Sequence, residues 1–187
     1  MLESPSPSDH DLLRRIASRD ENAFLTFYRR HQSLVYRFAL QMSGSAEQAE
    51  EVTQDVFMTV MGSAKQYDPE RGSAAAYLIG IARNLVLRSI ERDWPYVMLD
   101  DADGGPAVEQ DPLDELTRQE RIESLKKAVL TLPPAYREVV VLCDLHELDY
   151  TEAAEVLGCA IGTIRSRLHR ARALLLEKMR ASERCAV

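Results

Sequence analysis

The sequence predicts an all-α protein of two small helical domains, joined by a flexible acidic linker, with a helix-turn-helix in the second domain. Three observations carry this prediction. Apolar residues recur at steps of three and four along most of the 187-residue chain, which is the period of an amphipathic helix. Residues 95–112 interrupt that pattern with prolines, glycines and acids. Two further helical patterns meet at Gly158.

The first half of the chain is expected to hold three main helices. The apolar face of the first is formed by Phe24, Phe27, Tyr28, His31, Val35, Phe38 and Met42. Ser45 and Gln48 fit a capping box at the start of the second helix. Its apolar face is formed by Ala49, Val52, Val56, Phe57 and Val60. A loop at residues 67–73 precedes the third helix, which should stop near Trp94 because Pro95 disfavours helix in the residue before it.

Residues 95–112 mark the expected domain boundary. They offer little apolar surface to offset the entropy of ordering the chain, so we expect a flexible linker. Its acidic residues are Asp100, Asp101, Asp103, Glu109 and Asp111. The predicted domains are therefore residues 1–94 and residues 113–187.

The second domain is expected to begin with a helix near 113–131. Pro133 and Pro134 should open the next helix, since proline is tolerated in a first turn. Residues 135–147 are apolar on most sides, which predicts a buried helix. Its apolar residues include Val139, Val140, Val141, Leu142 and Leu145. The run from Val139 to Leu142 also fits a short strand, but the helical pattern around it favours helix.

Residues 150–176 have the pattern of a helix-turn-helix. Thr151 is the expected N-cap of its first helix, and Gly158 allows the sharp turn after that helix. On the second helix, which begins near Ile161, the predicted buried face comprises Ile161, Ile164, Leu168, Ala171 and Leu175. The opposite face carries Gly162, Arg165, Ser166, His169 and Arg170, and its flanks carry Arg167 and Arg172.

A polar, cationic helix face of this kind fits the major groove of DNA, where arginine can donate two hydrogen bonds to guanine. The alternative is an arginine-rich face that is only solvated. The net charge is −7, but it is unevenly distributed: residues 100–127 carry a net −5 and residues 161–187 a net +5. The acidic middle and the basic end therefore indicate different partners.

Several classes of protein are excluded by what the sequence lacks. No apolar run approaches the roughly 18 residues of a membrane span, and the N-terminus does not resemble a signal peptide. We therefore expect a cytoplasmic protein with no direct membrane insertion. The chain contains no Walker-type phosphate loop, metal triad or serine-nucleophile elbow, so neither an enzyme nor a cofactor is expected.

The three cysteines do not form a disulfide framework, because they are scattered and odd in number. Cys143 and His146 are spaced like half a metal site, but zinc normally needs four ligands. No metal is therefore expected. Most free cysteines act as small hydrophobes, and a regulatory bridge between Cys143 and Cys185 is the alternative.

Five stretches resemble the extracytoplasmic-function (ECF) RNA polymerase sigma factors of the sigma-70 superfamily. The first half contributes AEEVTQDVF (49–57), YDPERGS (67–73) and YLIGIARN (77–84). The second half contributes LPPAYREVVVL (132–142) and DYTEAAEVLGCAIGTIRSRLHRARALL (149–175). The stretches follow the family's order and spacing over nearly the whole chain.

This resemblance implies a promoter-specificity subunit for RNA polymerase. Residues 1–94 would dock on core polymerase and would recognise and open the −10 element, whereas residues 113–187 would read the −35 element as duplex. The implied polymerase-binding residues are Glu51, Gln54, Asp55 and Thr59. The implied −10 residues are Tyr67, Arg71, Arg83, Asn84 and Arg88. The implied −35 residues are Arg165, Ser166, Arg167, His169, Arg170 and Arg172.

Some of these positions carry a second interpretation. Tyr67 fits a base-stacking residue and a structural tyrosine equally, and Tyr77, where the family usually has tryptophan, is interpreted as core. The implied partners are core RNA polymerase, promoter DNA and an anti-sigma factor. A stand-alone helix-turn-helix regulator is the alternative function, but it would give the first half of the chain no role.

Overall fold

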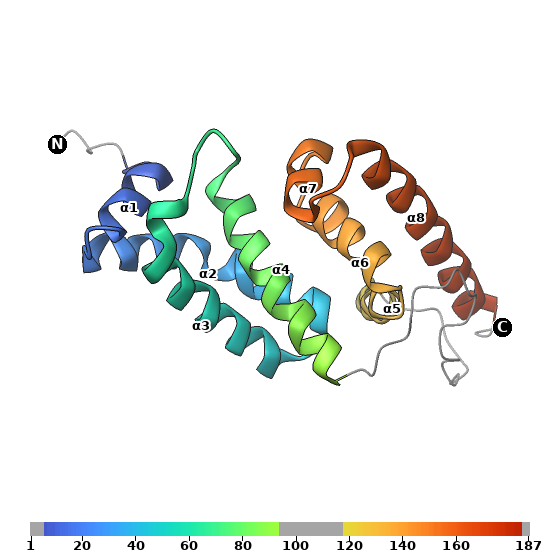
Figure 1. The fold of residues 1–187 in the computed structure, drawn as a ribbon. Helices are drawn as coiled ribbons and strands as arrows, with labels where there is room; N and C mark the ends of the chain where they lie inside the picture. Colours follow the sequence, from blue (N-terminus) through green and yellow to red (C-terminus); the bar gives the residue numbers. More distant parts are fainter. Residues whose placement is uncertain (1–5, 94–117, 185–187) are drawn as a thin grey trace. The chain divides into compact units, whose positions relative to one another are not determined.

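The computed structural model describes residues 6–93 and 118–184, and it divides the chain into two compact units, Met1–Asp93 and Trp94–Val187 (Figure 1). Within the described ranges all regular structure is helical, and the second unit contains a helix-turn-helix. The all-α prediction is therefore confirmed. The expected linker at 95–112 and Cys185 lie outside the described residues.

The first unit is a bundle of α2 (Glu21–Ser43), α3 (Ala46–Ser63) and α4 (Ala74–Asp93), each of which contacts the other two. The short helices α1 (Asp9–Ile16) and η1 (Ala64–Gln66) lie against one another at one end. Gly44, at φ 74°, ends α2 in the left-handed conformation that glycine adopts without strain. Ser45 then caps α3 by accepting a hydrogen bond from the Gln48 backbone N–H, as the sequence predicts.

A cluster of aromatic rings joins α2 and α3 within the core of the first unit. Phe27 and Phe38 are at most 1% exposed. The Phe57 ring lies between 4.8 and 6.4 Å, centroid to centroid, from the rings of Phe24, Phe27 and Tyr28. Aromatic pairs at this separation stabilise a fold by more than the burial of their surface alone, so these rings hold α2 against α3.

Helix α1 is fixed to α2 by an ion pair as well as by apolar packing. The carboxylate of Asp9 lies 2.5 Å from a guanidinium nitrogen of Arg30 and 3.0 Å from the imidazole Nε2 of His31. Arg30 also donates to the backbone carbonyl of Pro7 at 3.1 Å. Leu12, on the same short helix, is fully buried, so α1 is a firmly held part of this unit.

The second unit comprises α5 (Arg118–Leu130), α6 (Pro134–Val140), η2 (Val141–Leu145), α7 (Tyr150–Leu157) and α8 (Ile161–Arg184). Pro133 and Pro134 open α6 as predicted. The guanidinium of Arg137 donates hydrogen bonds to the carbonyls of Leu130 and Leu132, where α5 ends. The bond to Leu130 satisfies a carbonyl that a helix end leaves without an intrahelical donor, and the bond to Leu132 holds the turn that follows.

The expected helix at 135–147 needs two corrections. Beyond Val140 the chain forms η2, a turn of π-helix in which the His146 N–H donates to the carbonyl of Val141 at 3.0 Å. A π-turn contains an extra residue and so shifts the helical register of the residues after it. Leu145, expected to be buried, is consequently 41% exposed.

The predicted N-cap of α7 is also wrong. Asp149, rather than Thr151, caps the helix, because its carboxylate accepts hydrogen bonds from the backbone N–H groups of Thr151 and Glu152 at 2.7 and 2.9 Å. The Glu152 side chain accepts in return from the Asp149 N–H at 3.3 Å. This reciprocal pair is a capping box, which places Thr151 inside the first turn.

Candidate nucleic-acid interface

The turn between α7 and α8 is formed by Gly158, which adopts a left-handed φ of 62°. No neighbouring atom would obstruct a side chain there, so the backbone conformation is what favours glycine. From this turn α8 runs as the second helix of the helix-turn-helix. Its buried face consists of Ile164, Leu168, Ala171 and Leu175, none more than 9% exposed. Ile161, expected on this face, is 38% exposed, because the first residue of a helix has packing neighbours on only one side along the axis.

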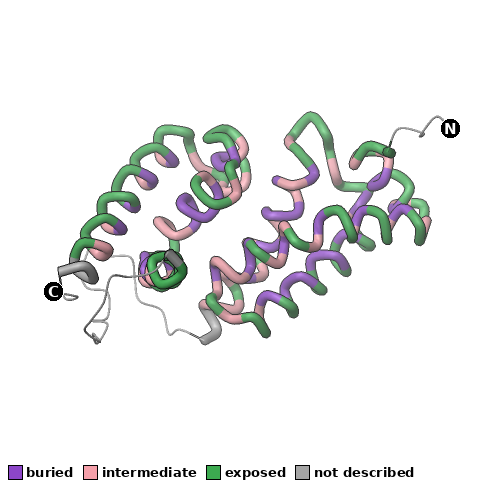
Figure 2. The backbone as a smooth tube through the Cα atoms, turned by 180° about the vertical axis from the view of Figure 1, so that it is seen from behind, coloured by how far each residue is buried: buried purple, intermediate pink, exposed green. Residues whose placement is uncertain are grey.

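The opposite face of α8 is open to solvent, as the alternating buried and exposed stretches in Figure 2 show. Arg165, Ser166, His169 and Arg170 are all exposed, and Arg167 is half-buried at the flank. Four side chains that can donate to DNA therefore lie together along one helix. The structure thus brings together the predicted −35 residues of this face.

Two contacts hold individual arginines of α8, and the sequence pattern did not single out either partner. The guanidinium of Arg165 lies 5.8 Å from the centre of the Tyr150 ring, within the range of a cation–π contact. Arg172 makes a two-pronged ion pair with Asp144 of η2, at 3.1 and 2.5 Å. The hydrogen bond to this carboxylate raises the pKa of Arg172. One predicted DNA contact is thus engaged within the protein.

The loop at residues 67–73 is held in shape by its own hydrogen bonds. The Tyr67 hydroxyl donates to the carbonyl of Gly72 at 3.2 Å, and the Arg71 N–H donates to the carbonyl of Asp68 at 3.1 Å. Gly72 has a φ of 147°, a region that favours glycine. Burial raises the pKa of the Tyr67 hydroxyl, and the nearby charges of Asp9 and Asp68 raise it further. Tyr67 therefore has a structural role in the loop.

Tyr77 connects this loop to the bundle. Its ring centre lies 5.4 Å from that of Tyr67, and its hydroxyl is 2.8 Å from the hydroxyl of Ser63 at the end of α3. Tyr77 is half-buried, so it forms the edge of the core rather than its centre. Nothing in the local sequence pattern marks Ser63 as its partner.

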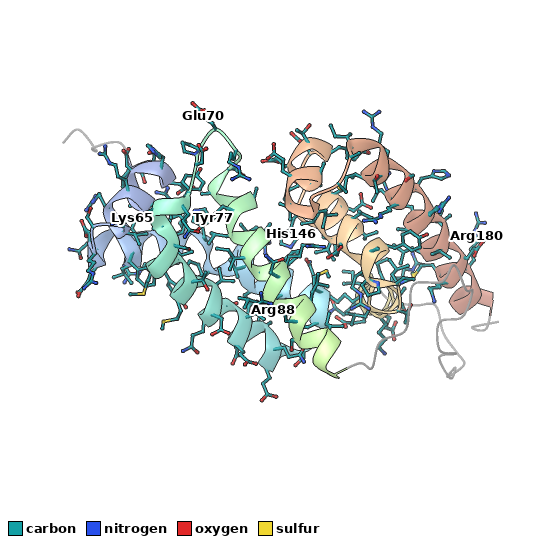
Figure 3. The ribbon with its side chains drawn as sticks, viewed as in Figure 1. Lys65, Glu70, Tyr77, Arg88, His146 and Arg180 are labelled. Atoms are coloured by element: carbon teal, nitrogen blue, oxygen red, sulfur yellow. The ribbon has the colours of Figure 1, made fainter. Side chains whose placement is uncertain are left out.

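The remaining predicted −10 residues continue from the loop onto α4. Arg71, Asn84 and Arg88 are exposed, and Arg83 is half-buried and has a partner within the protein. Asn84 and Arg88 are one helical turn apart, so they share a face. Figure 3 shows Glu70 at the tip of the loop and Arg88 further along α4.

The predicted polymerase-binding residues lie on the exposed side of α3. Glu51, Gln54, Asp55 and Thr59 are all exposed, whereas the opposite side of the helix is buried. Gln54 also lines a groove of about 940 Å³ between α2 and α3. Met58 and Met61 in this groove are 62% and 55% exposed. The sequence pattern did not single out these methionines, although they come after Gln54 at helical steps of four and three.

Neither a metal centre nor a membrane span is found within residues 6–93 and 118–184. No group of three or more potential metal ligands occurs among them. No described helix is both long and apolar enough to cross a bilayer. Cys143 and Cys159 are free and half-buried, and burial raises the pKa of the Cys143 thiol.

Comparison with known protein families identifies both units. Residues 27–95 match the model of sigma-70 region 2, and residues 122–175 match that of sigma-70 region 4. These matches define a sigma factor of the sigma-70 class. The curated relatives then narrow the class: the chain belongs to the ECF RNA polymerase sigma factors.

Among these relatives, the sigma factor RpoE of Cereibacter sphaeroides is 33% identical over 90% of this chain and 91% of its own length. SigE of Mycolicibacterium smegmatis is 37% identical, over 77% of this chain and 56% of that relative. The protein therefore directs RNA polymerase to promoters and is not an enzyme. The match to region 2 accounts for the first half, which a stand-alone regulator would leave without a role.

Solved structures of similar proteins agree with this assignment. CnrH, in complex with the cytosolic domain of CnrY, has a TM-score of 0.70 and 25% identity, covering 94% of this chain and 99% of that one. RpoE of Bartonella quintana, in complex with the anti-sigma factor NepR, has a TM-score of 0.63 and 28% identity, covering 84% of this chain and 96% of that one.

Proposed function

We propose that the two units divide promoter recognition between them: the first unit binds polymerase and the opened −10 element, and α8 of the second unit reads the −35 duplex. The observation that carries this proposal is the exposed cationic face of α8 opposite its buried stripe. Such a face presents donors to base edges while the apolar side anchors the helix to its own unit.

On α8, Arg165 and Arg170 are the proposed readers of guanine, because a guanidinium can donate to both of its major-groove acceptors. Ser166 and His169 lie beside them and complete the reading face. Arg167, at the flank, is assigned to a phosphate. Arg172 is also assigned to a phosphate, but the phosphate must compete with Asp144, the partner of Arg172 in the free protein.

In the first unit, Arg71, Arg83, Asn84 and Arg88 are proposed to bind the melted −10 strand. Tyr67 shapes the loop, since its hydroxyl bonds to Gly72 and its ring contacts Tyr77. Cationic and amide side chains supply the hydrogen bonds and charge that an unpaired strand needs.

Core polymerase is proposed to dock on the exposed face of α3 that carries Glu51, Gln54, Asp55 and Thr59. The groove beside this face adds Met58 and Met61, whose flexible side chains adapt to a partner surface. A polar stripe next to exposed apolar side chains is typical of an interface with an apolar centre and a polar rim.

We further infer that this chain is controlled by an anti-sigma factor and acts in the cytoplasm. Two structural relatives were solved in complex with CnrY and with the anti-sigma factor NepR, which supports a partner of this kind. Its other partners, core polymerase and promoter DNA, place its action in the cytoplasm.

Promoter binding with and without core polymerase tests the division of labour. The free protein should bind promoter duplex poorly, because two weak sites joined by a tether gain affinity only when their spacing is fixed. The holoenzyme should bind the same duplex with sequence preference. Tight, specific binding by the free protein at physiological salt would contradict the proposal.

Charge reversal at Asp55 tests the docking face. Asp55→Arg should weaken binding to core polymerase without unfolding the unit, because the side chain is exposed. Glu70→Arg, at the loop tip, makes the same charge change away from α3 and serves as the matched control (Figure 3). Normal core binding by Asp55→Arg would move the docking surface elsewhere.

A further inference from the structure

A second cationic feature of the first unit lies between α1 and η1, beside the loop at residues 67–73. It is a cleft of about 200 Å³ whose charged and polar rim consists of His10, Arg14, Lys65 and Tyr67. A cleft of this volume can admit a phosphate group. No carboxylate is among its lining residues.

The acids nearest to this cleft lie outside its lining, and their side chains have partners of their own. Asp9 is held by Arg30 and His31. Asp68 accepts the backbone N–H of Glu70 at 3.0 Å. Asp11 approaches Arg14 only to 3.9 Å, a distance at which an exposed ion pair is weak. The charges of Asp9 and Asp68 act on Tyr67, whereas Arg14 has only its weak contact with Asp11, so Arg14 and Lys65 can pair with an anionic ligand.

The cleft is built on a firm base. Leu13 and Ala64 form part of its wall and are 1% and 5% exposed. Helix α1 is fixed by the Asp9–Arg30 ion pair described above, and η1 is the direct continuation of α3. Figure 3 shows Lys65 at η1, on the α1 side of the loop. The backbone that carries the rim residues is thus held in place, while the Arg14 and Lys65 side chains remain exposed.

We propose that this cleft binds a backbone phosphate of single-stranded promoter DNA, one that neighbours the segment held by the loop. The inference rests on the proposed −10 role of the loop. Tyr67 belongs to both features: it lines the cleft, and its hydroxyl closes the loop onto Gly72. A strand that crosses the loop therefore passes next to Arg14 and Lys65, which can neutralise its phosphate.

The test uses holoenzyme and a single-stranded oligonucleotide that carries the non-template −10 element with its flanks. Lys65→Ala and Arg14→Ala should each make the plot of log affinity against log salt shallower by about 0.7, the value for one phosphate contact on a single strand. A fourfold rise in salt would then cost about 2.6-fold less affinity than in the unmodified protein. Arg29→Ala, an exposed arginine of α2 outside the cleft, should leave the slope unchanged.

Replacing the phosphates one at a time with uncharged methylphosphonate locates the contact. One linkage should matter to the unmodified holoenzyme and to Arg29→Ala, but not to Lys65→Ala. Unchanged slopes in both cleft variants would overturn the proposal. It would also be overturned if the variants bound the strand normally but lost affinity for core polymerase or for an acidic peptide, because the cleft would then serve another partner. Repeating the measurements on a strand of scrambled sequence keeps the two proposals separate. If the unmodified holoenzyme bound the scrambled strand as tightly as the −10 strand, the proposed role of the loop would be rejected. The salt slopes of the cleft variants would still decide whether the cleft binds a phosphate.

Discussion

The two units present their proposed DNA contacts in different ways. In the second unit the contacts lie on α8, whose orientation is fixed by backbone hydrogen bonds and by the buried stripe from Ile164 to Leu175. In the first unit they begin on a loop whose shape depends on the hydroxyls of Tyr67 and Tyr77. A helix face should therefore be sensitive mainly to loss of its cations, whereas the loop should also be sensitive to residues that never touch DNA.

The cores of the two units also differ in the side chains that join their helices. Aromatic rings join α2 to α3 in the first unit, while aliphatic side chains such as Val139, Leu142 and Leu168 fill the second. Each unit buries its own set of side chains. Damage to one core should therefore leave the other unit folded.

The largest effect is expected for Phe27→Ala, because Phe27 is fully buried in the first core. It should destabilise the first unit by about 3–5 kcal/mol, the usual cost of removing a buried phenylalanine side chain. Hydrogen exchange resolved by residue would show lost protection in α2, α3 and α4 and unchanged protection in α6 and α8. An equal loss in α8 would show that the units fold as one.

Arginine substitutions on α8 should cost less and should differ from one another. Arg165→Ala and Arg170→Ala should each cost roughly 1–3 kcal/mol in −35 binding and relax preference at one base position. Arg167→Ala should weaken all sequences about equally and lower the salt slope by about one unit. Arg172→Ala should change the slope less than Arg167→Ala does, because Asp144 already engages it. Equal salt slopes for Arg167→Ala and Arg172→Ala would show that Asp144 does not hold Arg172 away from DNA.

The capping box of α7 predicts a smaller, purely structural effect. Asp149→Ala should destabilise the second unit by about 1 kcal/mol, since an N-cap carboxylate satisfies backbone donors that the helix leaves unpaired. Thr151→Ala, at an exposed position inside the first turn, is the control and should change little. Thermal unfolding of both variants measures the difference, and a larger effect for Thr151→Ala would restore it as the cap.

The loop should respond to a change that removes no charge. Tyr67→Phe deletes the hydrogen bond to Gly72 and should cost about 0.5–1.5 kcal/mol. Promoter opening, monitored by permanganate reactivity of unpaired thymines, should fall while −35 binding stays unchanged. Normal opening by Tyr67→Phe would show that the loop keeps its shape without this bond.

The same hydroxyl gives this variant a pH signature. Burial raises the Tyr67 pKa above its ordinary value of 10.0. Its neutral form therefore favours the folded state, and that stabilisation is lost as the pH rises from the unfolded-state pKa through the folded-state pKa. The unmodified protein should lose stability above about pH 10 more steeply than Tyr67→Phe, and parallel pH profiles would contradict this assignment.

Local patterns in the sequence were sufficient for helices α2, α3, α4, α7 and α8, the turn at Gly158 and the exposed cationic face of α8, but they did not predict α1. They could not supply contacts between residues far apart in the chain. The partners Ser63 of Tyr77 and Asp144 of Arg172 are 14 and 28 residues away, and no periodicity links them. The residue type of Thr151 predicts an N-cap, but the nearby carboxylate of Asp149 accepts from the backbone N–H groups at the start of α7. The π-turn at η2 adds a residue to the helix and so turns Leu145 out of the core, which the apolar pattern alone does not predict.

The central claim is that each unit recognises its own promoter element when polymerase holds them together. Selection from a promoter library randomised in both elements tests it directly, with holoenzyme that carries either the unmodified protein or the Arg165→Ala, Arg170→Ala double variant. The account predicts that the double variant loses base preference within the −35 element and keeps the preference of the unmodified holoenzyme at −10. Retained −35 preference, or a changed −10 preference, would contradict it.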